Sequence, residues 1–119
     1  MQRFIELAGW QRSHALVLQI YRLTREFPKE ERFNLTSQVR RAALSVPTNI
    51  AEGSKRIGRQ DYARFLNIAD GSLAETEYLL IVSRDLGYLT REMHDTQSKD
   101  IAEIARMLHG LRAKVKGKG

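Results

Sequence analysis

Apolar residues recur every three or four positions along four stretches of the chain, and the positions between them are mostly polar. This spacing is the period of an amphipathic helix that buries one face. No stretch shows the strict alternation of a half-buried strand. With short polar connections between the stretches, the pattern predicts an all-α, antiparallel up-down four-helix bundle. The four predicted helices cover residues 10–26, 34–55, 59–86 and 91–113.

The ends of the four stretches define one domain. Residues 1–9 form a short leader, residues 10–113 form the bundle, and residues 114–119 form a basic tail that we expect to be disordered. Pro28 ends the first helix, because a residue that precedes a proline is pushed out of the α region. Thr90 is placed to cap the fourth helix.

The second helix carries an unusual pattern. Phe33, Val39 and Ile50 belong to its predicted core face, yet Pro47 lies within the same helix. A proline inside a helix removes one backbone hydrogen bond and costs about 3 kcal/mol. Two outcomes are open, a kinked continuous helix or a break at residues 45–47. Because the apolar register continues across the proline, we expect a kink at Pro47.

Beside this core face, the second helix carries polar residues at helical spacing, with small residues between them. The polar residues are Gln38, Arg41, Ser45, Asn49 and Glu52. A polar stripe is usually solvated, but the small residues favour close packing here. The polar groups are then satisfied either within the bundle or across a boundary with another subunit, and both alternatives stay open.

The third and fourth helices have apolar faces of their own. In the third, Gly71 costs about 1 kcal/mol relative to alanine, so we expect another helix backbone to approach closely at Gly71 and Ser72. In the fourth, Met93, Ile101 and Leu108 belong to the predicted core face.

Composition places the chain among ordinary soluble globular domains. It has 119 residues, of which 42% are hydrophobic and 29% are charged, and a core of this size needs no disulfide or metal. The absence of cysteine excludes disulfides and thiolate sites and fits a reducing cytoplasm. No apolar run reaches the length of a membrane span, and the N-terminus lacks a signal-peptide pattern. We therefore expect a cytoplasmic protein with no membrane partner.

Positive charge is concentrated in two segments of a chain whose net charge is +6. Residues 38–64 hold six basic residues against Glu52 and Asp61, and residues 112–119 hold four basic residues and no acid. This concentration suits a polyanionic partner such as RNA or DNA. The alternative is a solvated surface with a solubilising tail. The candidate nucleic-acid-binding residues are Arg40, Arg41, Lys55, Arg56, Arg59 and Arg64.

Two aromatic residues, Tyr62 and Phe65, lie close in sequence to these cations. Aromatic side chains among arginines can stack on unpaired bases of a nucleic acid. Their helical spacing also places both residues in the core, and the pattern favours this second interpretation.

The sequence contains no arrangement of residues typical of a catalytic site. His14, His94 and His109 lie singly on different helices, and none is spaced with a carboxylate as a pair of metal ligands. His14 is expected to be a hydrogen-bonded core or interface residue. No glycine-rich phosphate loop is present, and Ser45 and Ser72 have no nearby base. We therefore predict a non-enzymatic protein with no catalytic residue, metal or cofactor.

Several runs of residues are similar to those of a known bacterial family. They include QVRRAA over residues 38–43, SVPTNIAEG over 45–53 and ADGSLAE over 69–75. Over about residues 5–111 the chain resembles the four helix bundle protein family. This family is also called the ribosomal-RNA intervening-sequence protein family, because some members are encoded inside inserts in large-subunit ribosomal RNA genes.

The resemblance implies an up-down four-helix bundle that assembles into a ring-shaped homopentamer. A related group comprises the accessory proteins of diversity-generating retroelements, basic pentamers that are thought to bind RNA and the reverse transcriptase. The family itself has no assigned reaction. The residues expected at the oligomer interface or in structural roles are Gln38, Ser45, Pro47, Asn49, Glu52, Gly53, Gly71, Ser72 and Glu75.

Two functions are consistent with these features. The first is a non-enzymatic homo-oligomer, pentameric by resemblance, that contacts the phosphates of a nucleic acid through the basic turn between the second and third helices. RNA is favoured over DNA as its partner. The second is a structural or protein-interaction scaffold, in which the polar stripe of the second helix makes subunit contacts and the charge is incidental.

Overall fold

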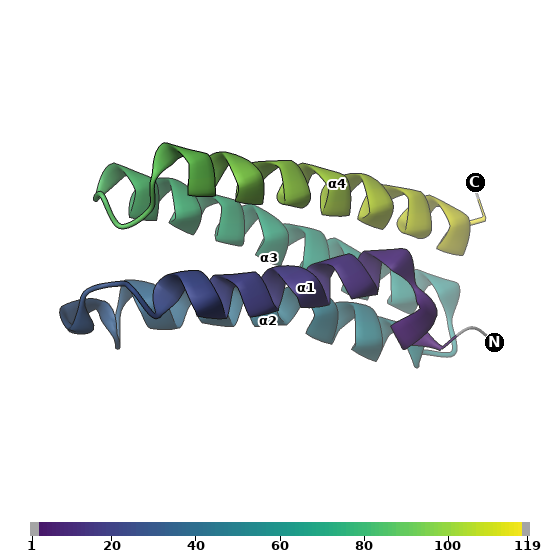
Figure 1. The fold of residues 1–119 in the computed structure, drawn as a ribbon. Coiled ribbons are helices and arrows are strands. Elements are labelled where there is room, and N and C mark those ends of the chain that lie inside the picture. Colours follow the sequence, from purple (N-terminus) through teal and green to yellow (C-terminus); the bar gives the residue numbers. More distant parts are fainter. Residues whose placement is uncertain (1–2, 118–119) are drawn as a thin grey trace.

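The computed structural model describes residues 3–117, and within them the chain forms helices and no strands (Figure 1). Two single-turn 3-10 helices, η1 (Phe4–Glu6) and η2 (Lys29–Glu31), each precede a longer α-helix. The α-helices are α1 (Ala8–Thr24), α2 (Leu35–Ser54), α3 (Arg59–Asp85) and α4 (Arg91–Val115). The predicted all-α four-helix bundle is therefore confirmed.

The four helices run up and down along the long axis of a molecule that measures 44 × 25 × 20 Å. Each helix packs on the next one in the chain, and α4 also packs on α1, which closes the bundle. The two chain ends and the α2–α3 connection therefore lie at one end of the molecule (Figure 1). The α1–α2 and α3–α4 connections lie at the other end.

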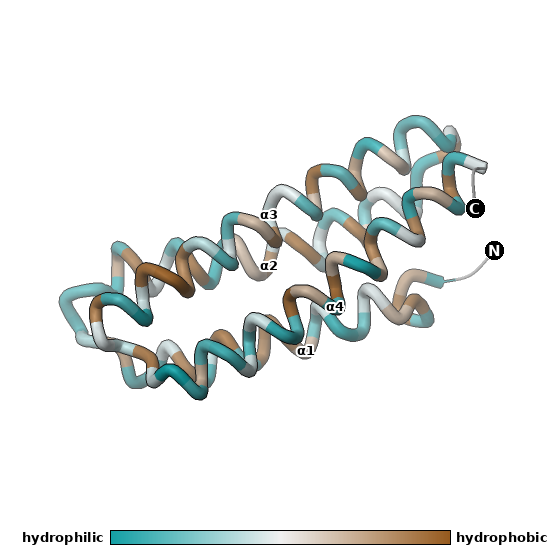
Figure 2. Tube along the Cα trace, turned by 90° about the horizontal axis from the view of Figure 1, so that it is seen from above, coloured by the Kyte–Doolittle hydropathy of each residue, from teal (hydrophilic) through white to brown (hydrophobic). Residues whose placement is uncertain are grey.

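The core lies between the helices, where hydrophobic segments recur along each of them (Figure 2). Each leucine or isoleucine side chain that is fully buried contributes about 1.5–3 kcal/mol. Large side chains that are almost wholly buried come from all four helices, and they are Leu16, Ile20, Val39, Val46, Ile50, Leu66, Leu73, Leu80, Ile104 and Leu108.

Phe33 and Met93, which were predicted in the core, are exposed, as are Ile68 and Leu86 of the predicted apolar face of the third helix. Phe33 is 83% exposed, because it precedes the start of α2 and so does not follow the helical register of that helix. The guanidinium of Arg32 lies over its ring at 5.4 Å. Met93 is 44% exposed, and the neighbouring His94 and Gln97 are buried in its place. The inward face at the start of α4 is thus shifted from the predicted one.

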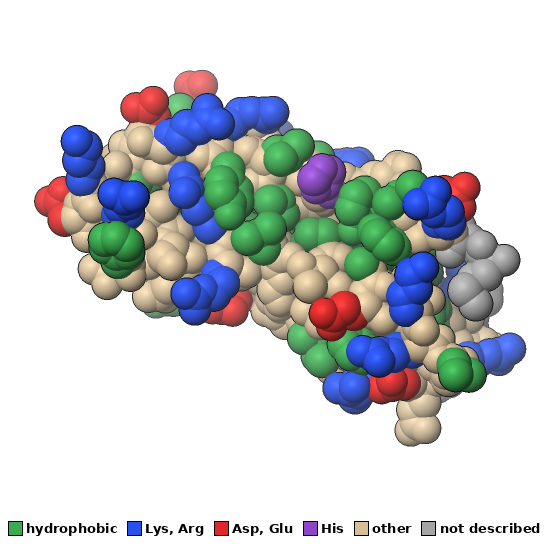
Figure 3. Space-filling model, turned by 90° about the horizontal axis from the view of Figure 1, so that it is seen from below, with side chains coloured by type: hydrophobic (Ala, Val, Ile, Leu, Met, Phe, Trp, Pro, Cys, Tyr) green, Lys and Arg blue, Asp and Glu red, His purple; other side chains and the backbone are tan. Residues whose placement is uncertain are grey.

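Other apolar side chains remain exposed on the face formed by α1 and α2, where they lie among basic residues (Figure 3). Leu18 and Leu44 are 44% and 40% exposed. His14, expected as a core or interface residue, is exposed and stacks on Trp10 with a centroid distance of 5.1 Å. An exposed apolar patch of this kind is typical of a surface that contacts another molecule.

The helix ends differ from the prediction by a few residues. Thr90 caps α4 as predicted, since its side chain accepts a hydrogen bond from the Met93 amide at 3.1 Å. The expected tail is partly helical, because α4 continues to Val115. The helix thus includes Lys114 and Val115, beyond the predicted end at residue 113, and residues 118–119 of the tail lie outside the described part.

Helix α2 continues without interruption through Pro47, which excludes a break at residues 45–47. Side chains that follow the proline donate to the carbonyl groups of the turn before it. Thr48 donates to the Leu44 carbonyl at 2.7 Å, and Asn49 donates to the Ser45 carbonyl at 2.8 Å. Neither bond reaches the Ala43 carbonyl, which loses its amide donor at Pro47, but side-chain bonds of this type often accompany a bend in a helix. The direction and size of a kink at Pro47 stay a prediction.

Candidate nucleic-acid interface

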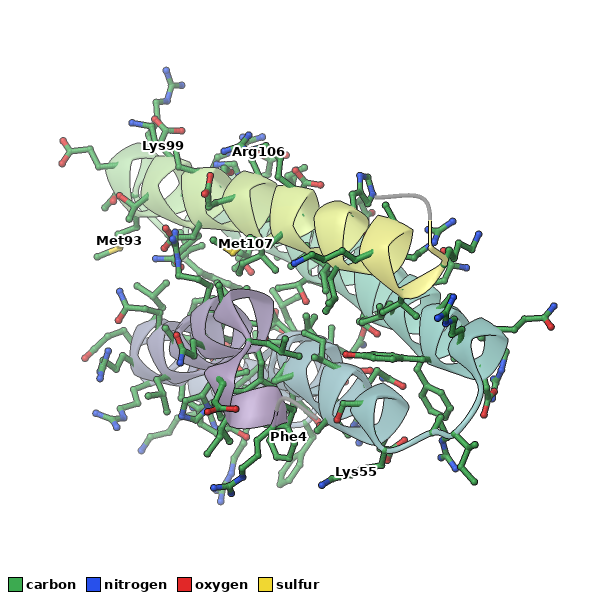
Figure 4. The ribbon with its side chains drawn as sticks, turned by 90° about the vertical axis from the view of Figure 1, so that its right-hand side faces the viewer. Phe4, Lys55, Met93, Lys99, Arg106 and Met107 are labelled. Carbon is green, nitrogen blue, oxygen red and sulfur yellow. The ribbon has the colours of Figure 1, made fainter. Side chains whose placement is uncertain are left out.

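The structure brings together two basic segments that are far apart in the sequence. The turn between α2 and α3 lies beside the C-terminal end of α4, and Figure 4 looks onto this end of the bundle. Between them is a groove of about 440 Å³, which we call the basic-end groove. Its apolar lining comes from Leu7, Ile57, Leu111 and Val115, together with the ring of Tyr62. The charged residues that line it are Arg56, Arg59 and Lys114, which are all basic.

Gly53 allows the end of α2 to lie close to α3. A Cβ atom at this position would lie 2.7 Å from the Cβ of Phe65 and 3.0 Å from the Cδ1 of Tyr62. Only glycine permits so close an approach of the backbone to these side chains. Of the two aromatic residues, Phe65 is buried in the bundle, whereas Tyr62 is half-buried and lines the groove.

Two cations of the turn are partly neutralised within the chain. Arg64 forms a salt bridge with Asp61 at 2.9 Å, and Arg56 lies 3.9 Å from the same carboxylate. Both guanidinium groups also lie over the ring of Phe65 in cation–π contact. The distance to the ring centroid is 4.6 Å for Arg56 and 4.7 Å for Arg64. Because two arginines cover Phe65, its ring is not free to stack on a base.

The remaining cations of this end are less engaged. Within residues 3–117, Lys55, Arg59, Lys114 and Lys116 take part in no salt bridge. Lys55 points away from the bundle near the α2–α3 turn (Figure 4). Burial raises the pKa of the Tyr62 hydroxyl, so this side chain is neutral at physiological pH. The groove thus carries positive charge and no ionised acid.

Arg40 and Arg41 do not belong to this site. They precede the turn by about fifteen residues of helix, which corresponds to about 22 Å. Arg40 is half-buried, donates to Thr24 Oγ1 at 2.8 Å, and lies over the ring of Tyr21 at 4.5 Å. It therefore joins α2 to the end of α1, whereas Arg41 is exposed. The predicted set of six cations is split between two places.

Part of the polar stripe of α2 is satisfied within the bundle, which is one of the two outcomes that the sequence left open. Ser45 and Ser72 form a hydrogen bond between α2 and α3 at 2.8 Å, and Asn49 donates to Ser45 Oγ at 2.9 Å. These groups are therefore satisfied within the bundle. The other members of the stripe, Gln38, Arg41 and Glu52, are exposed, as is Glu75 of α3, and their contact with another subunit stays a prediction.

The expected close approach at Gly71 does not occur within this chain. Gly71 is exposed, and a Cβ atom placed there would meet no atom within 4 Å. Its neighbour Ser72 does contact α2, but through the side-chain hydrogen bond to Ser45. Packing inside the bundle therefore does not explain why a glycine occupies this position.

Residues 3–117 contain few side chains arranged to bind a metal or to catalyse a reaction. Among residues 3–117 no group of three metal-ligating side chains is found. His94 and His109 lie 3.8 and 3.5 Å from Asp95 and Asp70 respectively, as isolated pairs. None of the helices within this range is long and apolar enough to cross a membrane.

Comparison with known proteins places the chain in a family. The family model of the 23S rRNA-intervening sequence proteins matches residues 5–110. The chain belongs to this family. A solved structure from Bacteroides thetaiotaomicron VPI-5482, a protein of unknown function from the S23 ribosomal protein family, has a TM-score of 0.81 and 28% sequence identity, and the match covers 88% of this chain and 98% of that one. No curated protein matches the chain.

Sequence analysis missed the part of the groove that α4 supplies. Lys114 was assigned to a disordered tail, and Leu7 to a leader before the bundle. A signal for the longer helix was present, because Leu108, Leu111 and Val115 continue the helical spacing beyond residue 113. No sequence signal places these residues beside the α2–α3 turn, since that contact depends on how the helices pack.

Proposed function

We propose that this member of the family is a non-enzymatic, homo-oligomeric RNA-binding protein of the cytoplasm that contacts phosphates through its basic end. The observation that carries the proposal is the convergence of the α2–α3 turn and the end of α4 around one groove lined by Arg56, Arg59 and Lys114. Arg59 and Lys114 form no salt bridge within residues 3–117, whereas Arg56 also faces Asp61. Clustered cations attract phosphates and release counterions on binding.

Assembly supports this function because it repeats the basic end. A ring needs two different, complementary faces on each subunit, since head-to-tail contacts generate rings. The exposed apolar face of α1 and α2, with Leu18 and Leu44, supplies one candidate face. The exposed part of α2 and α3 around Glu52, Gly71 and Glu75 supplies the other. In a pentamer, five basic ends would bind one RNA with higher avidity than a single end.

The test measures binding of a labelled RNA at a series of salt concentrations. A variant in which Lys55, Arg59 and Lys114 are replaced by Gln loses three cations of the basic end. We expect its logarithmic salt slope to fall by about 2, since each phosphate contact to a single strand contributes about 0.7. A matched control replaces Lys29, Arg91 and Lys99, which are exposed cations elsewhere, and should keep the wild-type slope. Equal slopes for the two variants would contradict the proposed interface.

A protein-interaction scaffold is the second candidate, and the exposed apolar side chains of α1 and α2 favour it. It predicts a stable assembly that does not bind RNA even at low salt. The same titration therefore separates the two functions.

A further inference from the structure

We infer that the basic-end groove holds an unpaired nucleobase, so that the protein prefers single-stranded to double-stranded RNA. This inference rests on the proposed function, because it concerns the manner in which the same end of the bundle contacts RNA. It depends on the combination of an apolar lining, one accessible aromatic ring and cations around them.

The lining of the groove suits a flat, weakly polar ring. Leu7, Leu111 and Val115 form its apolar wall, and Tyr62 adds a half-buried aromatic ring. Tyr62 is fixed by its packing against Gly53, whose missing side chain leaves room for the ring. A base that enters the groove thus meets an ordered aromatic surface, and stacking on such a surface tolerates any base.

Ile57 adds an exposed apolar side chain at the edge of the groove. This residue lies in the α2–α3 turn, lines the groove and has a relative exposure of 105%. A branched apolar side chain gains nothing from full exposure to water. Contact with the face of a base would remove part of its surface from water.

The cations of the groove are placed to hold the phosphates that flank such a base. Arg56, Arg59 and Lys114 are the charged lining residues, and they come from both sides of the groove. The volume of about 440 Å³ lies in the range of pockets that accept small ligands. An apolar wall beside cations fits a base with its phosphate better than it fits a run of acidic side chains, which have no ring to bury.

A base in a duplex is already stacked and paired and would have to leave the helix to enter the groove. The experiment therefore compares a short oligoadenylate with an RNA duplex of the same length, at equal phosphate concentration and moderate salt. We expect the single strand to bind about tenfold more tightly. Tyr62→Leu and Ile57→Ser should each remove most of that preference, whereas Tyr62→Phe, which keeps the ring, should retain it.

Two controls separate a lost contact from a lost fold. Ile57 is fully exposed, so Ile57→Ser tests the groove without disturbing the core, and thermal melts monitor Tyr62→Leu. Tyr78→Leu removes an exposed tyrosine of the same helix that is not part of the groove, and it should bind as the wild type does.

The possible results separate the groove from the proposed function. If single strand and duplex bind equally tightly, with the same salt dependence, the groove does not hold an unpaired base, although the protein still binds RNA. A preference for the single strand that survives both Tyr62→Leu and Ile57→Ser would also overturn it. If polyglutamate displaced bound RNA as effectively as oligoadenylate does, the groove would attract any polyanion, and this result would contradict the inference. Absence of RNA binding at low salt would overturn both proposals.

Discussion

At the scale of single residues, the two glycines of α2 and α3 have opposite surroundings. Gly53 faces Phe65 and Tyr62, and a Cβ atom would approach the Cβ of Phe65 to 2.7 Å. We expect Gly53→Ala to destabilise the fold by about 1–3 kcal/mol, as overpacking of a well-packed site does. Urea unfolding followed by circular dichroism measures this change, and an unchanged midpoint would show that the helices move apart without cost.

Gly71→Ala is the matched control for this prediction. Space is open around Gly71, so alanine there should stabilise the isolated subunit by about 0.5–1 kcal/mol through its better helix propensity. If another subunit packs on this position, the same substitution instead weakens assembly. A variant that is more stable yet associates less would place Gly71 in the subunit interface.

Single residues also show where sequence reasoning ends. Arg40 and Arg41 are adjacent in the sequence and were treated alike, but Arg40 binds Thr24 and Tyr21 of α1, whereas Arg41 is exposed. Composition gives both the same charge. Only the packing of α2 on α1 decides which of them is available to a ligand.

At the scale of elements, Glu31 connects the two loops at the end of the bundle opposite the groove. Its carboxylate accepts a hydrogen bond from the Tyr88 hydroxyl at 2.9 Å and a longer one from the Leu35 amide at the start of α2. The hydrogen bond to Glu31 raises the pKa of Tyr88, and partial burial and the nearby negative charges act in the same direction. The folded state therefore favours the neutral tyrosine.

This contact predicts a pH-dependent stability. Because the folded-state pKa of Tyr88 is raised, its stabilising effect is fully present below the pKa of the unfolded chain, about 10, and is lost as the pH rises through the folded-state pKa. At neutral pH the wild type should have a higher melting temperature than Tyr88→Phe, and this difference should disappear in alkaline solution. A gap between the melting temperatures that stays constant from neutral to alkaline pH would contradict this role.

The four helices were largely predictable, because each helix buries one face and its apolar residues therefore recur every three or four positions in the sequence. The four helices were predicted with ends within a few residues of those observed. The errors lie at the helix starts and ends. Phe33 follows the apolar pattern but precedes the first turn of α2. Met93 lies in the first turn of α4, where His94 and Gln97 take the inward positions instead.

At the scale of the whole molecule, the basic end results from the topology. An up-down bundle of four helices returns the end of α4 to the end at which α2 and α3 connect (Figure 1). Two segments that were predicted to be basic, separated by most of the third and fourth helices, thereby form one surface. The sequence predicted the charge of each segment. That the two segments meet around one groove depends on how the helices are arranged in space.

Assembly is the property on which the proposed function most depends at this scale, and the exposed face of α1 and α2 gives it a sharp test. Leu44 of α2 is 40% exposed and lies beside Tyr21 of α1. If this face is covered by a neighbouring subunit, Leu44→Glu removes an apolar contact and places a charge in the interface, which is unfavourable even beside Arg40 and Arg41. The variant should remain folded, because the side chain lies outside the core of its own chain.

Light scattering then measures the mass of each protein. We expect wild type to have the mass of about five chains of 13.7 kDa and Leu44→Glu to have the mass of one. Leu86→Glu serves as the control, since Leu86 is exposed near the α3–α4 connection at 53%, and it should leave the assembly intact. A wild-type mass of a single chain would remove the avidity that five basic ends provide, and RNA binding would then have to arise from one groove alone.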